Sequence, residues 1–354
     1  MAEIASVLAS GILTTGPKVL QLEHAIAGYL GVKHAIAVSS GTAALHLALL
    51  ALGIQPGDEV IIPDFSFPAT ANSVRLAGAT PICCDIDPTT FNIDPIRIKR
   101  LIGRNTKALM PVHQFGLAAE MASIMELSLG EEIAVVEDAA CALGAEFRTQ
   151  KCGTWGKVAC FSFHPRKIVT TGEGGLVVTS DDAIADKVRS LRNHGRVGKA
   201  YAYVGFNYRL SDVLAAIGLA QFAKLPRFIT QRREVAGRYN QYLKDTPGLT
   251  LPSEPEAHKH TYQSYVVILD RRFDRDRIIE ALKLDGIEAG IGTYAIHLLN
   301  AYKGNREIQK ADLSASEYAH CHTLSLPMYP AMTAEEVVFV CDSLGRHLTR
   351  GSET

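Results

Sequence analysis

A single lysine, Lys167, stands in a setting that can make its amine a nucleophile. It follows the aromatic segment Cys160–His164 and precedes a turn that contains Gly172, Gly174 and Gly175. Glycines let the backbone approach a ligand closely. A lysine that is partly desolvated near another cation has its ammonium form disfavoured and can attack an aldehyde. The same pattern also fits a surface lysine in a hairpin loop.

Two further segments end where a ligand can bind. In residues 38–45 (VSSGTAAL) a strand runs through small residues directly into a helix, whose first-turn N–H groups can hold a phosphate. In residues 133–141 an apolar strand ends in Glu137 and Asp138. An acid at the end of a buried strand points into the crevice where α/β sheets bind ligands. Taken alone, each segment also fits an ordinary capped helix start.

The elements that must position these residues follow from the apolar pattern. Strand-like runs alternate with helical ones through the first two thirds of the chain. The expected strands are 33–38, 59–63, 80–85, 106–111, 133–137, 157–163 and 175–179, and the expected helices include 42–52 and 69–77. Such alternation predicts an α/β fold, with parallel strands joined by crossover helices and a sheet covered on both faces.

From about residue 225 the pattern changes. A charged amphipathic helix is expected at 227–243, a lone strand at 263–269, and helices at 274–284 and 333–346. Because 354 residues are too many for one small core, we predict two domains. The large domain covers residues 1–225, and a smaller C-terminal α+β domain covers residues 226–354.

Composition argues against several classes of partner. The formal net charge is −1 and the basic residues are scattered, so neither nucleic acid nor an anionic membrane is expected as a partner. No apolar run approaches the roughly 20 residues that span a bilayer, and the N-terminus lacks a signal-peptide pattern. The seven cysteines include no CxxC pair, which favours reduced thiols and a cytoplasmic location. His320 and His322, two apart on a helix, would face different sides, so no metal site is expected.

Together with further motifs, these segments resemble the DegT/DnrJ/EryC1/StrS family of PLP-dependent sugar aminotransferases. The resemblance covers nearly the whole chain, and the motifs occur in the family's order, which is far more specific than any one motif. They are residues 13–17 (LTTGP), 40–42 (SGT), 63–70 (PDFSFPAT), 137–140 (EDAA), 161–175, 193–195 (NHG), 205–212 (GFNYRLSD) and 324–327 (LSLP). The resemblance implies a PLP-dependent transferase of fold type I.

The resemblance also implies how the cofactor is held. Lys167 would form a Schiff base with pyridoxal 5'-phosphate (PLP). Asp138 would pair with the pyridine nitrogen and keep it protonated, so that the ring can accept electrons. The phosphate would be bound by the backbone N–H groups of Gly41 and Thr42 and by the hydroxyl of Ser162.

Three more positions are matched to the family. Phe67 corresponds to the aromatic residue that stacks on the ring face. Asn207 corresponds to the position that reaches the phosphate of the neighbouring subunit's cofactor, which implies a homodimer with shared active sites. Cys141 stands beside the cofactor's phenolic oxygen, where many members have Gln or His, and a thiol is a poor hydrogen-bond donor. The N-terminus is also short relative to the family, so part of the usual substrate-side lid is expected to be missing or replaced.

For function, the resemblance implies a ping-pong transfer in which glutamate converts the cofactor to pyridoxamine 5'-phosphate. The amine would then pass to a keto sugar, most often a nucleotide-linked keto-deoxysugar. Tyr294 and His297 lie in the segment that contacts the sugar and its carrier in the family, and they are the candidate substrate contacts.

Three alternatives remain open at this point. A sugar dehydratase of the same family replaces the lysine with histidine, whereas this chain has Lys167. A non-catalytic regulatory protein of the same fold is expected to have lost the lysine or the aspartate, and both residues are present. An amino-acid lyase or decarboxylase on this fold has no distinguishing feature in the sequence.

Overall fold

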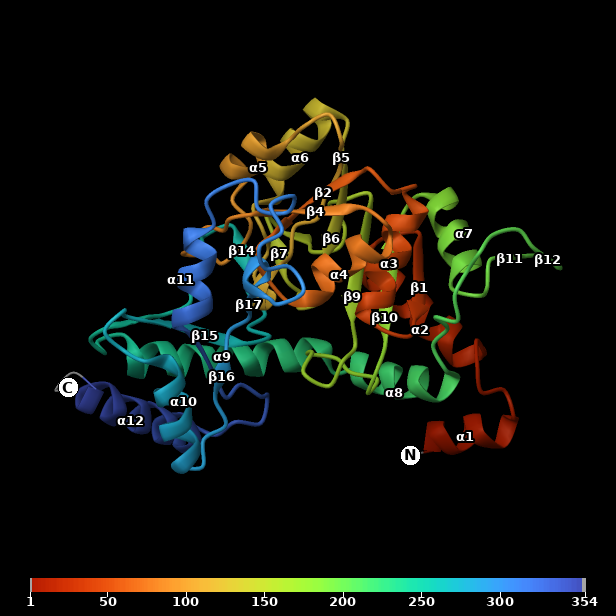
Figure 1. The fold of residues 1–354 in the computed structure, drawn as a ribbon. Coiled ribbons are helices and arrows are strands. Elements are labelled where there is room, and N and C mark those ends of the chain that lie inside the picture. The colour runs from red at the N-terminus through yellow and green to blue at the C-terminus, as the bar shows by residue number, and fades with distance from the viewer. Residues whose placement is uncertain (1, 352–354) are drawn as a thin grey trace.

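The computed structural model describes residues 2–351, which form one large and one smaller β-sheet with helices around them (Figure 1). The large sheet has seven strands. In spatial order they are β1 (His34–Val38), β10 (Gly175–Thr179), β9 (Val158–Ser162), β6 (Ala134–Asp138), β5 (Thr106–Leu109), β2 (Glu59–Pro63) and β4 (Thr80–Cys84). The predicted α/β fold with a mainly parallel sheet is confirmed.

Strand β10 is the exception, because it runs antiparallel to both of its neighbours, β1 and β9. The apolar pattern predicts a mainly parallel sheet and marks no particular strand as antiparallel. A parallel neighbour requires a crossover connection, usually a helix. Residues 163–174, which join β9 to β10, contain no helix, so β10 returns beside β9 in the opposite direction.

Helices cover both faces of this sheet. On one face pack α2 (Pro17–Leu30), α5 (Pro95–Leu101), α6 (Met121–Glu131) and α8 (Asp212–Phe222), and on the other α3 (Gly41–Ala51), α4 (Pro68–Leu76) and α7 (Asp182–Leu191). Side chains alternate along a strand, so the neighbours Val135 and Val136 of β6 belong to two separate cores. The N-terminal helix α1 (Ala2–Ser10) packs on α8.

The C-terminal part contains a four-stranded antiparallel sheet with a core of its own. Its strands, in spatial order, are β13 (Leu249–Thr250), β15 (Tyr265–Leu269), β18 (Thr323–Leu326) and β16 (Gly290–Ile291), and its helices are α9 (Leu225–Leu243), α10 (Arg275–Leu284) and α12 (Ala334–Gly351). The strand expected to stand alone, β15, is therefore paired on both sides. Its partners have only two to four residues, too few to show a strand pattern in the sequence.

Segments from the second half of the chain also return to the large sheet. Strand β14 (His258–Lys259) pairs with β7 (Glu146–Phe147), which pairs with β8 (Gln150–Lys151). Strand β17 (Tyr294–Ala295) pairs with β3 (Phe65–Ser66). Ile296, Ile308 and Leu313 pack in a core of the large sheet. The predicted domain boundary at residues 225–226 stays a prediction. At these contacts, segments from after residue 226 pack against the part of the chain that precedes it.

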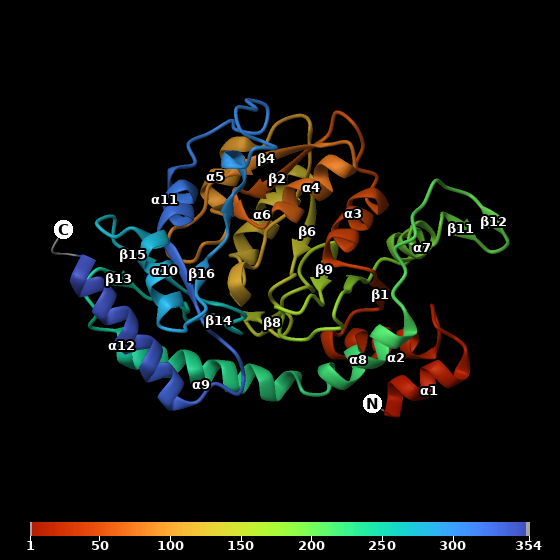
Figure 2. The same ribbon diagram turned by 60° about the horizontal axis from the view of Figure 1, so that its bottom comes forward.

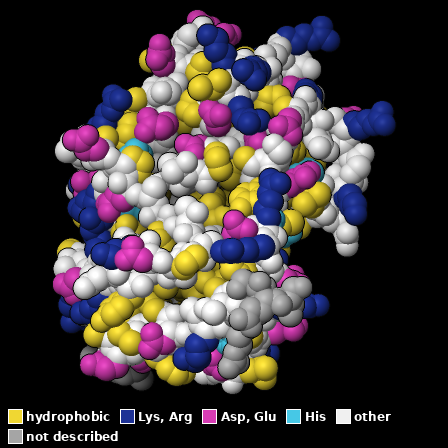
Figure 3. Space-filling view, turned by 90° about the vertical axis from the view of Figure 1, so that its left-hand side faces the viewer, with side chains coloured by type: hydrophobic (Ala, Val, Ile, Leu, Met, Phe, Trp, Pro, Cys, Tyr) yellow, Lys and Arg dark blue, Asp and Glu magenta, His cyan; other side chains and the backbone are white. Residues whose placement is uncertain are grey.

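The remaining elements lie at the periphery or in loops. They are the helix α11 (Ser314–His322), the short 3₁₀ turns Gln114–Gly116 and Ile296–Leu298, and the hairpin of β11 (Arg196–Val197) and β12 (Ala200–Tyr201). This hairpin projects on the side away from α12 (Figure 2). On the face in Figure 3, basic and acidic side chains are interspersed with apolar ones.

Within residues 2–351, no single helix is both long and apolar enough to cross a membrane; only the pair α8 and α9, bent by 57°, meets the length and composition criteria jointly. All seven cysteines are free.

Candidate active site

The candidate site lies at one edge of the large sheet, where β1, β6 and β9 end. On β6, Asp138 points to the same face as Val136, and on β9, Ser162 points to the same face as Cys160, because side chains alternate. Val136 and Cys160 both belong to the core beneath α3 and α4. Asp138 and Ser162 therefore share one face with the first turn of α3.

The first turn of α3 forms a cup beside Ser162. Ser40 is the N-cap, and its hydroxyl accepts the N–H of Ala43 at 3.1 Å. The N–H groups of Gly41 and Thr42 precede this bond and, as first-turn groups, have no intrahelical acceptor. They are therefore available to a phosphate, together with the hydroxyl of Ser162.

Close packing around this cup explains two of its glycines. A Cβ added to Gly41 would lie 2.8 Å from Cβ of Ser162, and a Cβ added to Gly175 would collide with the backbone of Ser40 and Gly41. At both positions only glycine fits without a shift of the backbone. The two glycines thus let Ser162 and β10 pack closely against the helix N-terminus, whose free N–H groups suit a phosphate.

Gly41→Ala is expected to weaken PLP binding roughly tenfold to a hundredfold, because an overpacked position costs about 1–3 kcal/mol. Titration of the apoprotein with PLP measures this affinity. Gly237→Ala on α9 is the matched control, since its added Cβ would have no atom within 4 Å. It should leave PLP affinity unchanged and stabilise the fold by about 0.5–1 kcal/mol. Wild-type affinity in Gly41→Ala would contradict the assignment of the cup.

Asp138 is buried, with 4% of its surface exposed. Its Oδ2 accepts the hydroxyl of Thr70 at 2.9 Å, and its Oδ1 accepts the N–H of Ala140 at 3.2 Å. The hydroxyls of Thr70 and Ser66 lie 2.8 Å apart. Burial raises the pKa of Asp138, while the bond from Thr70 and the charge of Lys167 oppose that rise. These two bonds fix the orientation of the carboxyl, and its oxygens can still accept a hydrogen bond from one more strong donor.

The neighbouring acid, Glu137, has a different role, because it points to the other face of β6. Its carboxylate accepts the imidazole of His113 at 2.9 Å and the N–H groups of Gly153, Trp155 and Gly156, each at 2.7 Å. These bonds fix the loop between β8 and β9. Of the two acids at this strand end, only Asp138 is free to meet a ligand.

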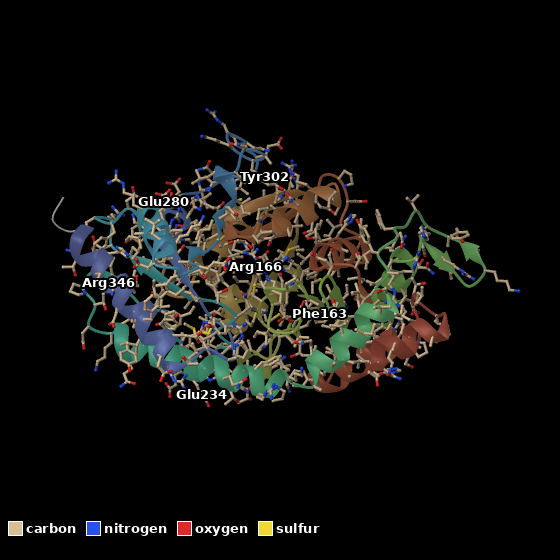
Figure 4. The ribbon with its side chains drawn as sticks, turned by 90° about the horizontal axis from the view of Figure 1, so that it is seen from below. Phe163, Arg166, Glu234, Glu280, Tyr302 and Arg346 are labelled. Atoms are coloured by element: carbon tan, nitrogen blue, oxygen red, sulfur yellow. The ribbon has the colours of Figure 1, made fainter. Side chains whose placement is uncertain are left out.

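Lys167 lies in the turn after β9. Its Nζ donates to Sγ of Cys141 at 3.0 Å, so the thiol is the nearest polar partner of the amine. The turn is fixed from the C-terminal part of the chain, because the side-chain amide of Gln263 donates to the carbonyl of Arg166 at 2.9 Å. Figure 4 shows Arg166 near the middle of the molecule, between the two sheets.

Phe67 and Tyr294 come together through the pairing of β3 with β17. Tyr294 stands opposite Ser66 in this pair, and its ring centroid lies 6.4 Å from that of Phe67. Phe67 is 54% exposed, so much of its side chain is accessible to a ligand. Tyr294 is half-buried beside it.

His297 is not exposed at the surface, as a side chain that contacts a substrate directly would be. It is buried, and its two ring nitrogens lie 2.6 Å from Oδ2 of Asp64 and 3.0 Å from Oε1 of Glu317. Its assignment as a direct substrate contact stays a prediction, and both nitrogens already have partners.

Asn207 lies next to the phosphate cup in the chain fold. The carbonyl of its neighbour Tyr208 accepts the N–H of Ser39 at 2.8 Å, and Asn207 itself bridges to Asn193 through the backbone. Its side chain is exposed in the single chain. This placement leaves it accessible to a second subunit, and the homodimer stays a prediction.

Thr70 and Gln263 are the residues that sequence reasoning missed. Thr70 is the last residue of the motif 63–70. The only signal for its role was that its hydroxyl lies in the first turn of the helix that begins within this motif. Gln263 was placed in a strand, and nothing near it in the sequence indicates that it reaches Arg166, 97 positions away. Within the described residues, no group of three or more His, Cys, Asp or Glu side chains is arranged to hold a metal ion.

The residues present fit PLP. The cup suits its phosphate, Phe67 offers an open ring face, and Asp138 lies within the influence of the charge of Lys167. A cavity of about 240 Å³ lies elsewhere, between residues 87–96 and His258. Neither Lys167, Asp138 nor Phe67 lines it. The candidate site is defined by its chemistry, because Lys167, the buried acid Asp138 and the first turn of α3 lie at the same edge of the sheet.

Comparisons with known proteins agree with this chemistry. The model of the DegT/DnrJ/EryC1/StrS aminotransferase family matches residues 1–345. GDP-perosamine synthase of Caulobacter vibrioides is 40% identical over 343 residues, which are 95% of this chain and 92% of that protein.

Two solved structures share the fold. One is DesI, crystallised in the presence of its TDP-sugar product, at 31% identity with a TM-score of 0.93 over 99% of this chain and 90% of that one. The other is a Streptococcus pneumoniae protein in a PLP form, at 25% identity with a TM-score of 0.94 over 99% and 96% of the two chains. The protein is a PLP-dependent sugar aminotransferase, and the chain belongs to the DegT/DnrJ/EryC1/StrS aminotransferase family.

Proposed function

We propose that this aminotransferase moves an amino group from glutamate to a nucleotide-linked keto-deoxysugar by a ping-pong mechanism. The proposal rests above all on the contact of Lys167 with Cys141 beside the buried acid Asp138. The nucleotide part is supported by the names of two relatives, a GDP-perosamine synthase and an enzyme crystallised with a TDP-sugar product.

The chain's own residues divide the work between binding and proton transfer. PLP, when bound, supplies an aldehyde and a ring that accepts electrons. Gly41, Thr42 and Ser162 would hold its phosphate. Asp138 would favour a proton on the ring nitrogen, because a buried carboxylate without a cation is costly.

Lys167 would hold PLP covalently, and its amine would move a proton as a general base and acid. Cys141 lies 3.0 Å from its amine and is the nearest group that can accept a hydrogen bond from it. Phe67 would stack on one face of the ring and exclude water from it. Tyr294, 6.4 Å from Phe67 between ring centroids, is the proposed contact to the sugar.

A homodimer in the cytoplasm completes the proposal. Asn207 is exposed beside the phosphate cup, where a second subunit can use it. The seven free cysteines are those of a reducing compartment.

The test separates the two half-reactions. Incubation of the PLP form with glutamate alone should shift the cofactor absorbance to that of the pyridoxamine form and release 2-oxoglutarate in stoichiometric amount. The pyridoxamine form is then offered a panel of nucleotide-linked keto sugars and the same sugars without the nucleotide. If glutamate fails but another amino acid reacts, glutamate is not the amino donor. If kcat/KM is equal with the free sugars, the acceptor does not need a linked nucleotide.

A further inference from the structure

Three segments far apart in the sequence meet at His297. Asp64 lies between β2 and β3, His297 in the 3₁₀ turn after β17, and Glu317 on α11. The ring nitrogens of His297 lie 2.6 Å from Asp64 and 3.0 Å from Glu317, and the backbone N–H of His297 donates to Asp64 at 2.9 Å. Asp64 is fully buried.

Two acceptors on one ring fix its charge. Ionised carboxylates only accept hydrogen bonds, so a ring that bonds both Asp64 and Glu317 must carry a proton on each nitrogen. Burial acts to lower the pKa of His297, but its bonds to Asp64 and Glu317 outweigh burial and raise that pKa. His297 is therefore an imidazolium held between two carboxylates, which we call the acid–histidine relay.

The relay holds the strand pair that presents the aromatic residues. The carbonyl of Asp64 accepts the N–H of Ile296 at 2.8 Å, directly after β17. On the far side, α11 places the ring of His320 6.3 Å from that of Tyr294. The ring of Tyr294 thus neighbours those of Phe67 and His320, and the relay joins the three segments on which these rings lie.

The same strand pair is linked to the cofactor acid. Ser66, which pairs with Tyr294, lies 2.8 Å from the hydroxyl of Thr70, and Thr70 donates to Asp138 at 2.9 Å. This link approaches Asp138 from the large-sheet side and does not involve His297. A disturbance of the relay is therefore expected to move Tyr294 before it reaches Asp138.

We propose that His297 is a positioning residue for the amino acceptor: held between Asp64 and Glu317, it fixes β17 against β3 and sets Tyr294 beside Phe67 to receive the sugar. This inference rests on the proposed function, in which Tyr294 contacts the sugar. In this inference His297 does not touch the sugar itself but acts by holding Tyr294 in place.

The charge requirement makes the positioning dependent on pH. Besides the two carboxylates, the titratable groups around the relay are Cys83, whose pKa is raised by burial and then by Asp64, and His320 on α11. When pH rises above the raised pKa of His297, the ring keeps one proton. It should stay with Asp64, because the side chain of Glu317 is 52% exposed and water can replace its bond.

The main experiment follows both half-reactions by rapid-mixing absorbance in wild type, His297→Gln and Glu317→Gln. In both variants the glutamate half-reaction should stay within about twofold of wild type, and acceptor kcat/KM should fall about tenfold, the effect of one charge-assisted hydrogen bond. In Glu317→Gln, the loss of one carboxylate lowers the pKa of His297, so the basic limb of the acceptor pH profile should move to lower pH.

A double-variant cycle tests whether His297 acts through Tyr294. If it does, His297→Gln combined with Tyr294→Phe should cost no more than the larger single effect. Ser316→Ala is the matched control, because Ser316 anchors α11 by donating to Asp85 at 2.6 Å without touching the relay. It should lower Tm while leaving the ratio of the two half-reactions unchanged.

A readout independent of activity is the charge of the ring. Histidine NMR at neutral pH, assigned by the signal missing in His297→Gln, should show His297 with protons on both nitrogens. A neutral ring, an equal loss in both half-reactions, or additive effects in the cycle would each overturn the inference. A wild type that rejects every nucleotide-linked sugar contradicts the proposed function alone, and the cycle then runs with any keto compound that it accepts.

Discussion

Replacement of Lys167 by alanine is expected to lower both half-reactions by roughly a thousandfold or more. The amine has two duties, covalent attachment of PLP and proton transfer, and general acid–base catalysis alone contributes about 10² to 10⁴ in rate. Within the described residues its nearest polar neighbour is the thiol of Cys141, which cannot replace an amine in bonding the aldehyde. Borohydride reduction followed by peptide mass spectrometry should locate the cofactor on Lys167 in the wild type and on no residue in the variant.

Lys167→Arg separates charge from chemistry. The guanidinium keeps the positive charge near Asp138 and Cys141. It stays protonated at every physiological pH, however, and therefore cannot form a Schiff base with the aldehyde. We therefore expect it to be as inactive as Lys167→Ala while its folding stability stays closer to wild type. Turnover above about one per cent of wild type in either variant, measured as 2-oxoglutarate release, would remove Lys167 from the mechanism.

The second large effect is expected in Asp138→Asn, with a loss of about 10²- to 10³-fold in kcat/KM, as for removal of a preorganised charged partner. The amide oxygen can still accept the Thr70 hydroxyl, so only the longer 3.2 Å bond from the N–H of Ala140 is lost. The absorbance of bound PLP should persist, because Lys167 is intact, while both half-reactions slow.

Stability should move the opposite way from activity in this variant. Burial raises the pKa of Asp138 above its unfolded value. A carboxyl with a raised folded pKa destabilises the apoprotein above that pKa, and the penalty disappears as pH falls through it. Asp138→Asn should therefore match or exceed the wild-type apoprotein in Tm at pH 8, with a smaller difference at acid pH.

Glu137→Gln is the matched control at the adjacent position. Its carboxylate accepts three backbone N–H groups and His113, and an amide has only one oxygen to accept them. This variant should lose Tm, by an amount that corresponds to several kcal/mol, yet retain PLP affinity. If Asp138→Asn lost stability and Glu137→Gln lost activity, the roles assigned to the two acids would be reversed.

Much of the candidate site was predictable because it lies where strands end. The period of two along β6 and β9 fixes which side chains share a face, and the carboxyl ends of parallel strands share an edge. Asp138 and the Ser40–Gly41–Thr42 turn are therefore predicted at this edge from the strand ends, whereas the role of Ser162 is implied only by the family resemblance. The glycines around Lys167 predict close approach of the backbone to a ligand, and in the structure Gly175 lies against the backbone of Ser40 and Gly41.

The limits of the sequence are clearest at His297. The match of its segment to the substrate side stays a prediction, and Tyr294 of that segment lies beside Phe67. Nothing near His297 in the chain, however, indicates that its partners are Asp64, 233 positions earlier, and Glu317, 20 positions later. Burial of a histidine between two carboxylates is a property of three packed segments.

The sequence by itself determined the strands and helices of the large sheet along the chain, and it predicted which residues lie at the strand ends, because these depend on local periodicity and on the residue types at strand ends. Only the tertiary structure decided the reversed direction of β10, the short partners of β15 and the contacts of Thr70, Gln263 and His297. The physical reason is that a repeating apolar pattern tells which face a side chain occupies. Which distant group it meets there depends on how the sheets and helices pack.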